Sequence, residues 1–87
     1  MSGIVYHGNF LKSAQRLSLA QRSKLAKLIE ILEENAFHPL LHTKRLTQEL
    51  TGFLSFRITR DWRVIFQFLD ADTIQLLRVA HRKDAYR

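Results

Sequence analysis

The sequence predicts an α+β fold, in which a small antiparallel sheet of about four strands is covered on one face by two N-terminal helices. Two observations lead to this prediction. The C-terminal part of the chain, residues 53–87, alternates apolar and polar residues in three runs separated by short turns, which is typical of an antiparallel meander. The part before Pro39 instead repeats its apolar residues at helical spacing.

The three runs of alternating residues predict the strands of the meander. Their ranges are Phe53–Thr59, Trp62–Phe68 and Thr73–Arg82. Matching the apolar faces of the first two runs predicts that Phe56 pairs with Val64 and Ile58 with Trp62, across a three-residue loop. In this register Arg57 lies directly opposite Arg63 on the polar face. The next compatible register would make the two arginines diagonal neighbours.

The third run follows a turn at Asp70-Ala71. The expected pairs are Val64 with Leu77 and Trp62 with Val79. This register also places Arg78 beside Arg63 on the polar face. A register shifted by one residue would bury Arg78, and an unpaired buried charge costs several kcal/mol or more.

One sheet face therefore carries Arg57, Arg63 and Arg78, with Arg82 at the strand end. The apolar residues expected around them are Ile65, Ile74 and Leu76, and no carboxylate lies among the three arginines in this register. The face is either ordinary solvated surface or a preformed site for a polyanion, because arginine forks suit phosphate groups. The sequence leaves both interpretations open.

The N-terminal segment predicts an edge strand at residues 4–7, followed by a helix over Phe10–Leu17 that Asn9 caps. A second helix begins at Ser18, which forms a capping box with Gln21. Its apolar stripe indicates that it covers the sheet. The stripe consists of Leu25, Leu28, Ile29, Leu32 and Ala36.

The second helix is expected to stop within residues 35–39, where Pro39 ends the helical pattern. Its polar side carries Arg22, Lys24 and Lys27 early, and glutamates late. The simplest interpretation of these charges is a solvated face. In the link to the sheet, Leu46 and Leu50 are expected to anchor the chain, and Gly52 to relieve a backbone constraint.

Size and charge limit the possible functions. The 87 residues predict one domain, residues 1–87, with a net charge of +6 that is concentrated in the C-terminal half. A basic half of this kind suits a nucleic-acid partner. The absence of cysteine, of a signal peptide and of a membrane-spanning run predicts a soluble cytoplasmic protein without membrane contact. No motif for a metal or a cofactor is present, so we expect neither.

Several motifs resemble the RelE/ParE superfamily of type II toxin–antitoxin toxins. The spacing of Gly52-Phe53, Arg57-Ile58-Thr59 and Arg63–Phe66 is similar to the YoeB branch, Asp61-Trp62 resembles the YafQ branch, and the ending 81–86 resembles many RelE-like chains. The closest resemblance is to the RelE and YoeB messenger-RNA interferases. It implies a RelE-like fold and a toxin that cleaves mRNA in the ribosomal A site. It also implies an acidic, RelB-like antitoxin as partner.

The resemblance also implies roles for individual residues. Arg63 corresponds to a catalytic phosphate contact, Arg82 to an arginine near the leaving group, and Tyr86 to a tyrosine that stacks on the substrate or assists proton transfer. We add Arg57, Arg78, Lys44 and Lys83 as RNA-phosphate contacts.

The acid/base groups of the family are not reproduced. The glutamate base of the YoeB branch aligns with Lys44, and the lysines of the RelE branch align with Leu54 and Phe56. His81 is the best local substitute, because an imidazole gains and loses its proton near neutral pH. Lys44 or His42 could assist.

Two alternatives to a nuclease stay open. A ParE-like protein would share the fold, inhibit DNA gyrase and cut nothing. A catalytically degenerate member would bind RNA without cleaving it. The missing base favours these alternatives, whereas Arg63 and the His-Arg-x-x-x-Tyr ending favour a nuclease.

Overall fold

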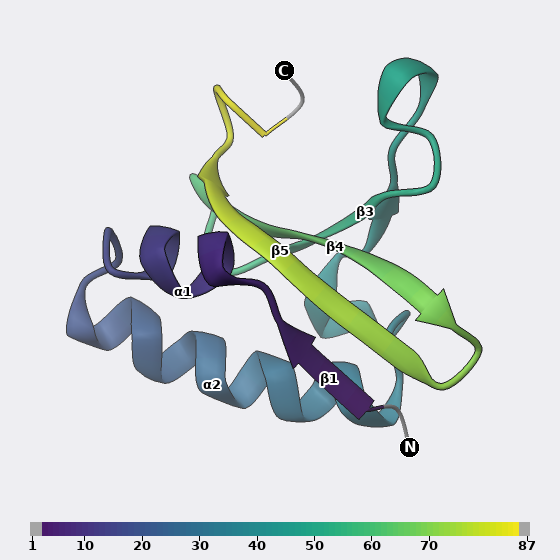
Figure 1. Ribbon diagram of the computed structural model, residues 1–87. Helices are drawn as coiled ribbons and strands as arrows, with labels where there is room; N and C mark the ends of the chain where they lie inside the picture. The colour runs from purple at the N-terminus through teal and green to yellow at the C-terminus, as the bar shows by residue number, and fades with distance from the viewer. Residues whose placement is uncertain (1–2, 86–87) are drawn as a thin grey trace.

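The computed structural model describes residues 3–85 and shows the predicted α+β fold. Two helices pack on one face of a mostly antiparallel five-stranded sheet, whose strand order is β1-β5-β4-β3-β2 (Figure 1). In chain order the elements are β1 (Gly3–Tyr6), α1 (Gly8–Ala14), α2 (Leu19–Glu34), the 3₁₀ turn η1 (Pro39–Leu41), β2 (Lys44–Arg45), the 3₁₀ turn η2 (Gln48–Leu50), β3 (Leu54–Arg57), β4 (Trp62–Asp70) and β5 (Thr73–His81). The short strands β1 and β2 flank the predicted meander.

The main core lies between the helices and the sheet. Helix α2 contributes the buried side chains of Leu25, Leu28 and Leu32. The sheet contributes Phe56 and Phe66, which are fully buried with ring centroids 5.9 Å apart. Because burying a side chain of this size contributes about 1.5–3 kcal/mol, this packing determines which sheet face stays uncovered. The prediction that α2 covers the sheet is confirmed.

The β3–β4 hairpin has the predicted register. Phe56 pairs with Val64, and Arg57 pairs with Arg63. The N–H of Ile58 donates to the carbonyl of Trp62 at 2.9 Å, which closes the three-residue loop 59–61. Side chains paired in an antiparallel ladder share a face, so both arginines project from the face that the helices leave uncovered.

The register predicted between β4 and β5 is wrong. Val64 pairs with Val79, and Trp62 pairs with His81, two residues along β5 from the expected partners. The turn between the strands is also one residue later than expected, because Asp70 pairs with Thr73.

A β-bulge after Ile65 explains the difference. Ile65 pairs with Arg78, but the next residue, Phe66, pairs with Leu76, so that Leu77 is an extra residue in β5. Arg78 therefore lies on the predicted sheet face, but it pairs with Ile65, whereas Arg63 pairs with Ala80, so the expected pairing of Arg78 with Arg63 is wrong. Ile74 and Leu76, which were expected beside the arginines, are instead fully buried under the helices. The extra residue reverses the inside–outside alternation partway along the strand.

The two helices begin at different kinds of cap. Helix α2 has the predicted capping box, in which the Ser18 and Gln21 side chains accept from each other's backbone N–H groups at 3.1 and 2.9 Å. For α1 the prediction is wrong. His7 is the N-cap, because it has the extended cap conformation and its Nδ1 accepts from the N–H of Asn9 at 3.0 Å.

The link from α2 to β3 is anchored as predicted. Leu46 is buried, and Leu50 packs beside it in a small apolar cluster on the arginine side of the sheet. Gly52 has a φ of 97°, a left-handed conformation that favours glycine. In this link β2 pairs with β3, with Lys44 opposite Ser55. Among the described helices, none has both the length and the apolar character needed to span a membrane.

Candidate active site

The uncovered sheet face carries a row of polar side chains from β2, β3 and β4. Lys44 pairs with Ser55, and Arg57 pairs with Arg63. Ser55 and Arg57 are two residues apart on one strand, so all four side chains lie on the same face. Three cations from three neighbouring strands therefore meet at this place.

These residues enclose a cavity of about 180 Å³, lined by His42, Lys44, Ser55, Phe56, Arg57 and Arg63. Ser55 is only 3% exposed and lies at its base. Arg57 is exposed, whereas Arg63 is half-buried and donates from Nη2 to the carbonyl of Arg60 at 3.0 Å. The hairpin loop thus holds one of the two guanidinium groups in place. We call this cavity with its six residues the arginine pocket.

His42 reaches the arginine pocket through the geometry of the preceding turn. Leu41 is fully buried, and His42 caps η1 with a left-handed φ of 49°. Its N–H donates to the carbonyl of Pro39 at 3.2 Å. The sequence indicated His42 only as an assisting group, since nothing local shows that the turn after Pro39 brings it beside Arg57.

Arg78 and Arg82 support the C-terminal segment. Arg78 donates from Nη2 to the carbonyls of Ala85 at 3.3 Å and Asp84 at 3.5 Å. Arg82 forms an ion pair with Asp61 at 3.4 Å, between side chains that are about half exposed. These contacts tie the segment after β5 to the sheet face and to the β3–β4 loop. Neither arginine lines the arginine pocket.

His81 lies on the other side of the sheet. Its ring packs edge-on against Trp62 with centroids 5.3 Å apart, and Trp62 belongs to the core on the helix side. Its Nδ1 accepts from the N–H of Lys83, whose side chain is exposed. The structure therefore separates His81 from the arginine pair. Tyr86 lies outside the described residues.

The electrostatics of the arginine pocket favour an anion. Among the described residues, no carboxylate lines the pocket. Paired like charges destabilise a sheet by a few tenths of a kcal/mol, whereas a bound phosphate would turn the repulsion into attraction. Within the same residues, no group of three or more His, Asp or Glu side chains could hold a metal ion.

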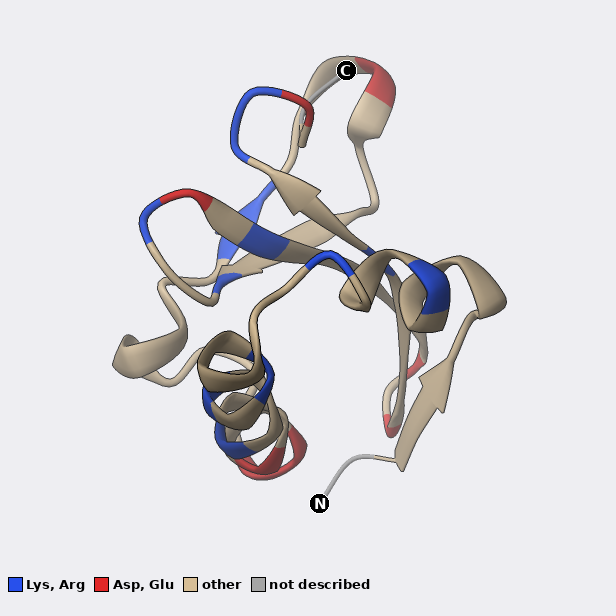
Figure 2. Cartoon of the chain, turned by 90° about the vertical axis from the view of Figure 1, so that its left-hand side faces the viewer, with Lys and Arg blue, Asp and Glu red and all other residues tan. Residues whose placement is uncertain are grey.

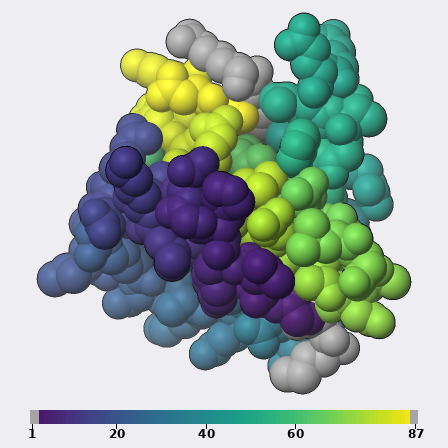
Figure 3. Space-filling view, in the orientation of Figure 1, coloured from purple at the N-terminus to yellow at the C-terminus, as the bar shows by residue number. Residues whose placement is uncertain are grey.

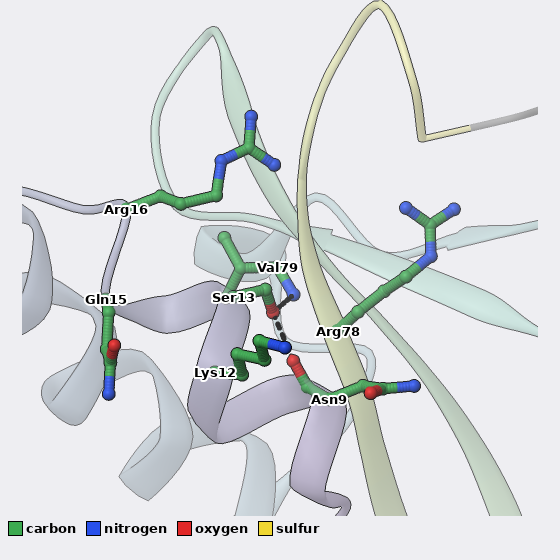
Figure 4. A pocket seen from close by; sticks show the side chains of 7 residues that line it. All are labelled: Asn9, Lys12, Ser13, Gln15, Arg16, Arg78 and Val79. Carbon is green, nitrogen blue, oxygen red and sulfur yellow. Dashed lines mark hydrogen bonds between the residues drawn. The ribbon is translucent and has the colours of Figure 1, made fainter.

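A larger cavity of about 550 Å³ lies between α1 and β5, where the N-terminal segment runs along β5 (Figure 3). Lys12, Arg16 and Arg78 line it together with Ser13 (Figure 4). The Ser13 hydroxyl donates to the carbonyl of Asn9 at 2.7 Å and accepts from the N–H of Val79 at 2.8 Å. Because β1 pairs with β5 only as far as Leu76, Ser13 satisfies a donor on the uncovered edge of β5.

Known proteins share this fold. The YoeB/ParE toxin from Agrobacterium tumefaciens is 18% identical, with 92% of this chain and 98% of that chain covered and a TM-score of 0.79. The Escherichia coli DinJ–YafQ complex gives 22% identity, full coverage of both chains and a TM-score of 0.77. The YoeB–YefM complex from Staphylococcus aureus gives 20% identity, 92% and 95% coverage and a TM-score of 0.73. A comparison with curated protein sequences finds no match.

At these identities the solved structures establish the fold, and a family model establishes the relationship. The model for the ParE toxin of the type II toxin–antitoxin system parDE matches residues 4–86. This range includes all five strands of the sheet except the first residue of β1. The chain therefore belongs to the ParE toxin family, within the RelE/ParE superfamily of toxins of type II toxin–antitoxin systems.

Proposed function

We propose that this toxin is an endoribonuclease that cleaves mRNA on the ribosome without a metal ion. The observation that carries the proposal is the arginine pocket, in which Arg57 and Arg63 pair directly and Lys44 and His42 join them around one cavity. Two guanidinium groups, an ammonium and an imidazole are sufficient for phosphodiester chemistry. The resemblance of the chain to RelE- and YoeB-like interferases supports the same conclusion.

RNA supplies the nucleophile for this reaction. The 2′-oxygen forms a bond to the adjacent phosphorus while the bond from phosphorus to the 5′-oxygen breaks, which leaves a 2′,3′-cyclic phosphate and a 5′-hydroxyl. A base must take the proton of the 2′-hydroxyl, an acid must protonate the leaving 5′-oxygen, and cations must stabilise the phosphorane.

The arginine pocket has a group for each task. Arg57 and Arg63 bind the non-bridging oxygens and stabilise the added charge, because both face the same cavity. His42 serves as the base and Lys44 as the acid, in place of the acid/base groups of the RelE and YoeB branches. In this assignment His42 takes the role considered for His81, which packs against Trp62 across the sheet.

The test is incubation of the purified protein with a defined mRNA, with and without ribosomes, followed by analysis of the product ends. We expect cleavage that leaves 2′,3′-cyclic phosphate and 5′-hydroxyl ends, the products of attack by the 2′-oxygen. The Arg63→Ala variant, prepared in the same way, controls for contaminating nuclease. Intact RNA under every condition would contradict the proposal.

A second candidate function is inhibition of DNA gyrase without cleavage of RNA. The observation in its favour is the match of the family model for ParE toxins over residues 4–86. Gyrase and relaxed plasmid are incubated with the protein, and supercoiling is measured on gels. Loss of supercoiling together with intact mRNA would establish this function in place of the nuclease.

The cognate partner is an antitoxin with an acidic segment that is disordered when free, of the RelB-like kind. The support is the net charge of +6 together with the cations of the arginine pocket. Two similar solved structures are complexes, DinJ–YafQ from Escherichia coli and the toxin–antitoxin complex YoeB–YefM from Staphylococcus aureus. Co-expression with the adjacent small reading frame tests this. Failure of the two proteins to co-purify at moderate salt would contradict it.

A further inference from the structure

A second cavity adjoins the arginine pocket. It has a volume of about 480 Å³ and is formed by α2, the turn after α2 and the β3–β4 hairpin. Its lining residues are Lys24, Lys27, Leu28, Leu40, His42, Arg57, Ile58, Thr59 and Arg60. Two of them, His42 and Arg57, also line the arginine pocket. The two cavities therefore meet along these two side chains, and we call the second one the α2 groove.

The α2 groove is strongly basic. Lys24, Lys27, Arg57 and Arg60 line it, and no carboxylate of residues 3–85 does. Within the described part of the chain, none of these four forms an ion pair with a carboxylate. The glutamates of α2 begin at Glu30 and lie toward the other end of the helix, whose basic and acidic turns are distinguished in Figure 2.

The two lysines belong to one side of α2, because residues three apart in a helix are neighbours on its surface. The sequence alone suggested that these charges form an ordinary solvated face. The structure instead directs that side of the helix toward Arg57 and Arg60 of the hairpin, around a common cavity. Cations from two distant parts of the chain converge there, as they do in the arginine pocket.

The floor of the α2 groove is apolar. Leu28 and Ile58 are buried beneath it, whereas Leu40 is 61% exposed at its edge. A groove with cations along its rim and apolar surface between them suits single-stranded nucleic acid, whose phosphates meet the charges while its bases cover the apolar surface. A polyanion without apolar faces would leave Leu40 exposed to water.

We propose that the α2 groove binds the RNA strand that flanks the scissile phosphate. The strand passes from the arginine pocket over His42 and Arg57, and its next phosphates contact Lys24, Lys27 and Arg60. This inference rests on the proposed RNA-cleaving function. It adds an extended binding site that contacts the charged RNA backbone and binds without sequence specificity.

The experiment measures binding of RNA in which every 2′-hydroxyl is methylated, so that it cannot be cleaved. Short oligonucleotides of about three nucleotides and long ones of about ten are compared, since single-strand sites span about 4–16 nucleotides. Lys24→Gln and Lys27→Gln are tested against Lys12→Gln, a matched change of an exposed helical lysine that lines the cavity beside β5.

Wild-type protein is expected to bind the long RNA more tightly than the short one. Each groove variant should weaken long-RNA binding several-fold and reduce the slope of log K against log salt by about 0.7, the value for one phosphate contact to a single strand. Short-RNA binding should stay unchanged, and Lys12→Gln should behave as wild type toward both RNAs.

Each opposite result has a distinct meaning. The α2 groove is not a binding site if the wild type binds short and long RNA equally, or if Lys27→Gln and Lys12→Gln have equal effects. The proposed nuclease function would still hold in that case, provided that the protein cleaves mRNA in the ribosome assay. A wild-type protein that neither binds nor cleaves RNA would overturn the proposed function itself.

Discussion

Arg57 lies directly opposite Arg63 in the β3–β4 ladder, on the sheet face that the helices leave uncovered. A favourable cross-strand pair contributes about 0.2–1 kcal/mol to the stability of a sheet, whereas a pair of like charges lowers the stability. The arrangement is unfavourable for folding. Under the proposed function it serves phosphate binding, which would be the usual conflict between stability and function.

Replacing Arg57 by threonine should separate these two effects. Arg57→Thr removes the repulsion and keeps a side chain that favours strands, so we expect unfolding stability to stay the same or to rise slightly while RNA cleavage weakens. Sulfate should stabilise the wild type more than the variant, because an anion that binds the folded site shifts the melting temperature. Thermal melts with and without sulfate measure this. A variant that melts well below wild type and responds equally to sulfate would make Arg57 a structural residue.

Arg63→Ala should remove most RNA cleavage and leave the fold intact. Loss of one preorganised contact to developing charge typically lowers the rate by about 10²–10³. The rate is measured with mRNA and ribosomes, and folding is checked by circular dichroism. Arg22→Ala, a change of an exposed arginine on α2 outside both cavities, is the control. Wild-type cleavage by a folded Arg63→Ala protein would refute the assignment.

The two histidines on opposite sides of the sheet give a direct test of the proton-transfer group. His42→Gln should lower cleavage by about 10²–10⁴, the usual contribution of general acid–base catalysis. His81→Gln should leave the rate of cleavage nearly unchanged, because His81 packs against Trp62 away from the arginine pocket. Single-turnover rates of both variants on the same RNA show which histidine takes part in proton transfer. If His81→Gln lowers the cleavage rate and His42→Gln does not, His81 is the catalytic group.

Ser13→Ala should destabilise the protein by about 1–3 kcal/mol, since it leaves the part-buried N–H of Val79 without its acceptor. Ser23→Ala, at an exposed position of α2, is the control and should change stability by at most about 0.5 kcal/mol. Urea denaturation measures both. If the two variants unfold alike, water replaces the Ser13 hydroxyl and the edge of β5 does not depend on it.

The local features of the fold follow from the sequence. The capping box of Ser18 and Gln21 and the apolar stripe of α2 depend on residues close together in the chain. In the β3–β4 hairpin the two alternating runs allow more than one register, and the common three-residue loop favours the register that the structure has. The pairing of Arg57 with Arg63, two of the six residues of the arginine pocket, is therefore the one that the sequence favoured.

Tertiary structure decided how the rest of the pocket is assembled, although the sequence had indicated Lys44 and His42 as candidates. The alternation of apolar and polar residues does not reveal that Leu77 is an extra residue. The β4–β5 register and the burial of Ile74 and Leu76 could therefore not be predicted from it. Strand β2 is two residues long, too short to leave a periodic signal, yet its pairing brings Lys44 beside the arginines. His42 joins them through a left-handed turn, and Lys24 and Lys27 face Arg60 because α2 packs across the sheet. Each of these contacts joins distant parts of the chain, and only the packed core sets their distance.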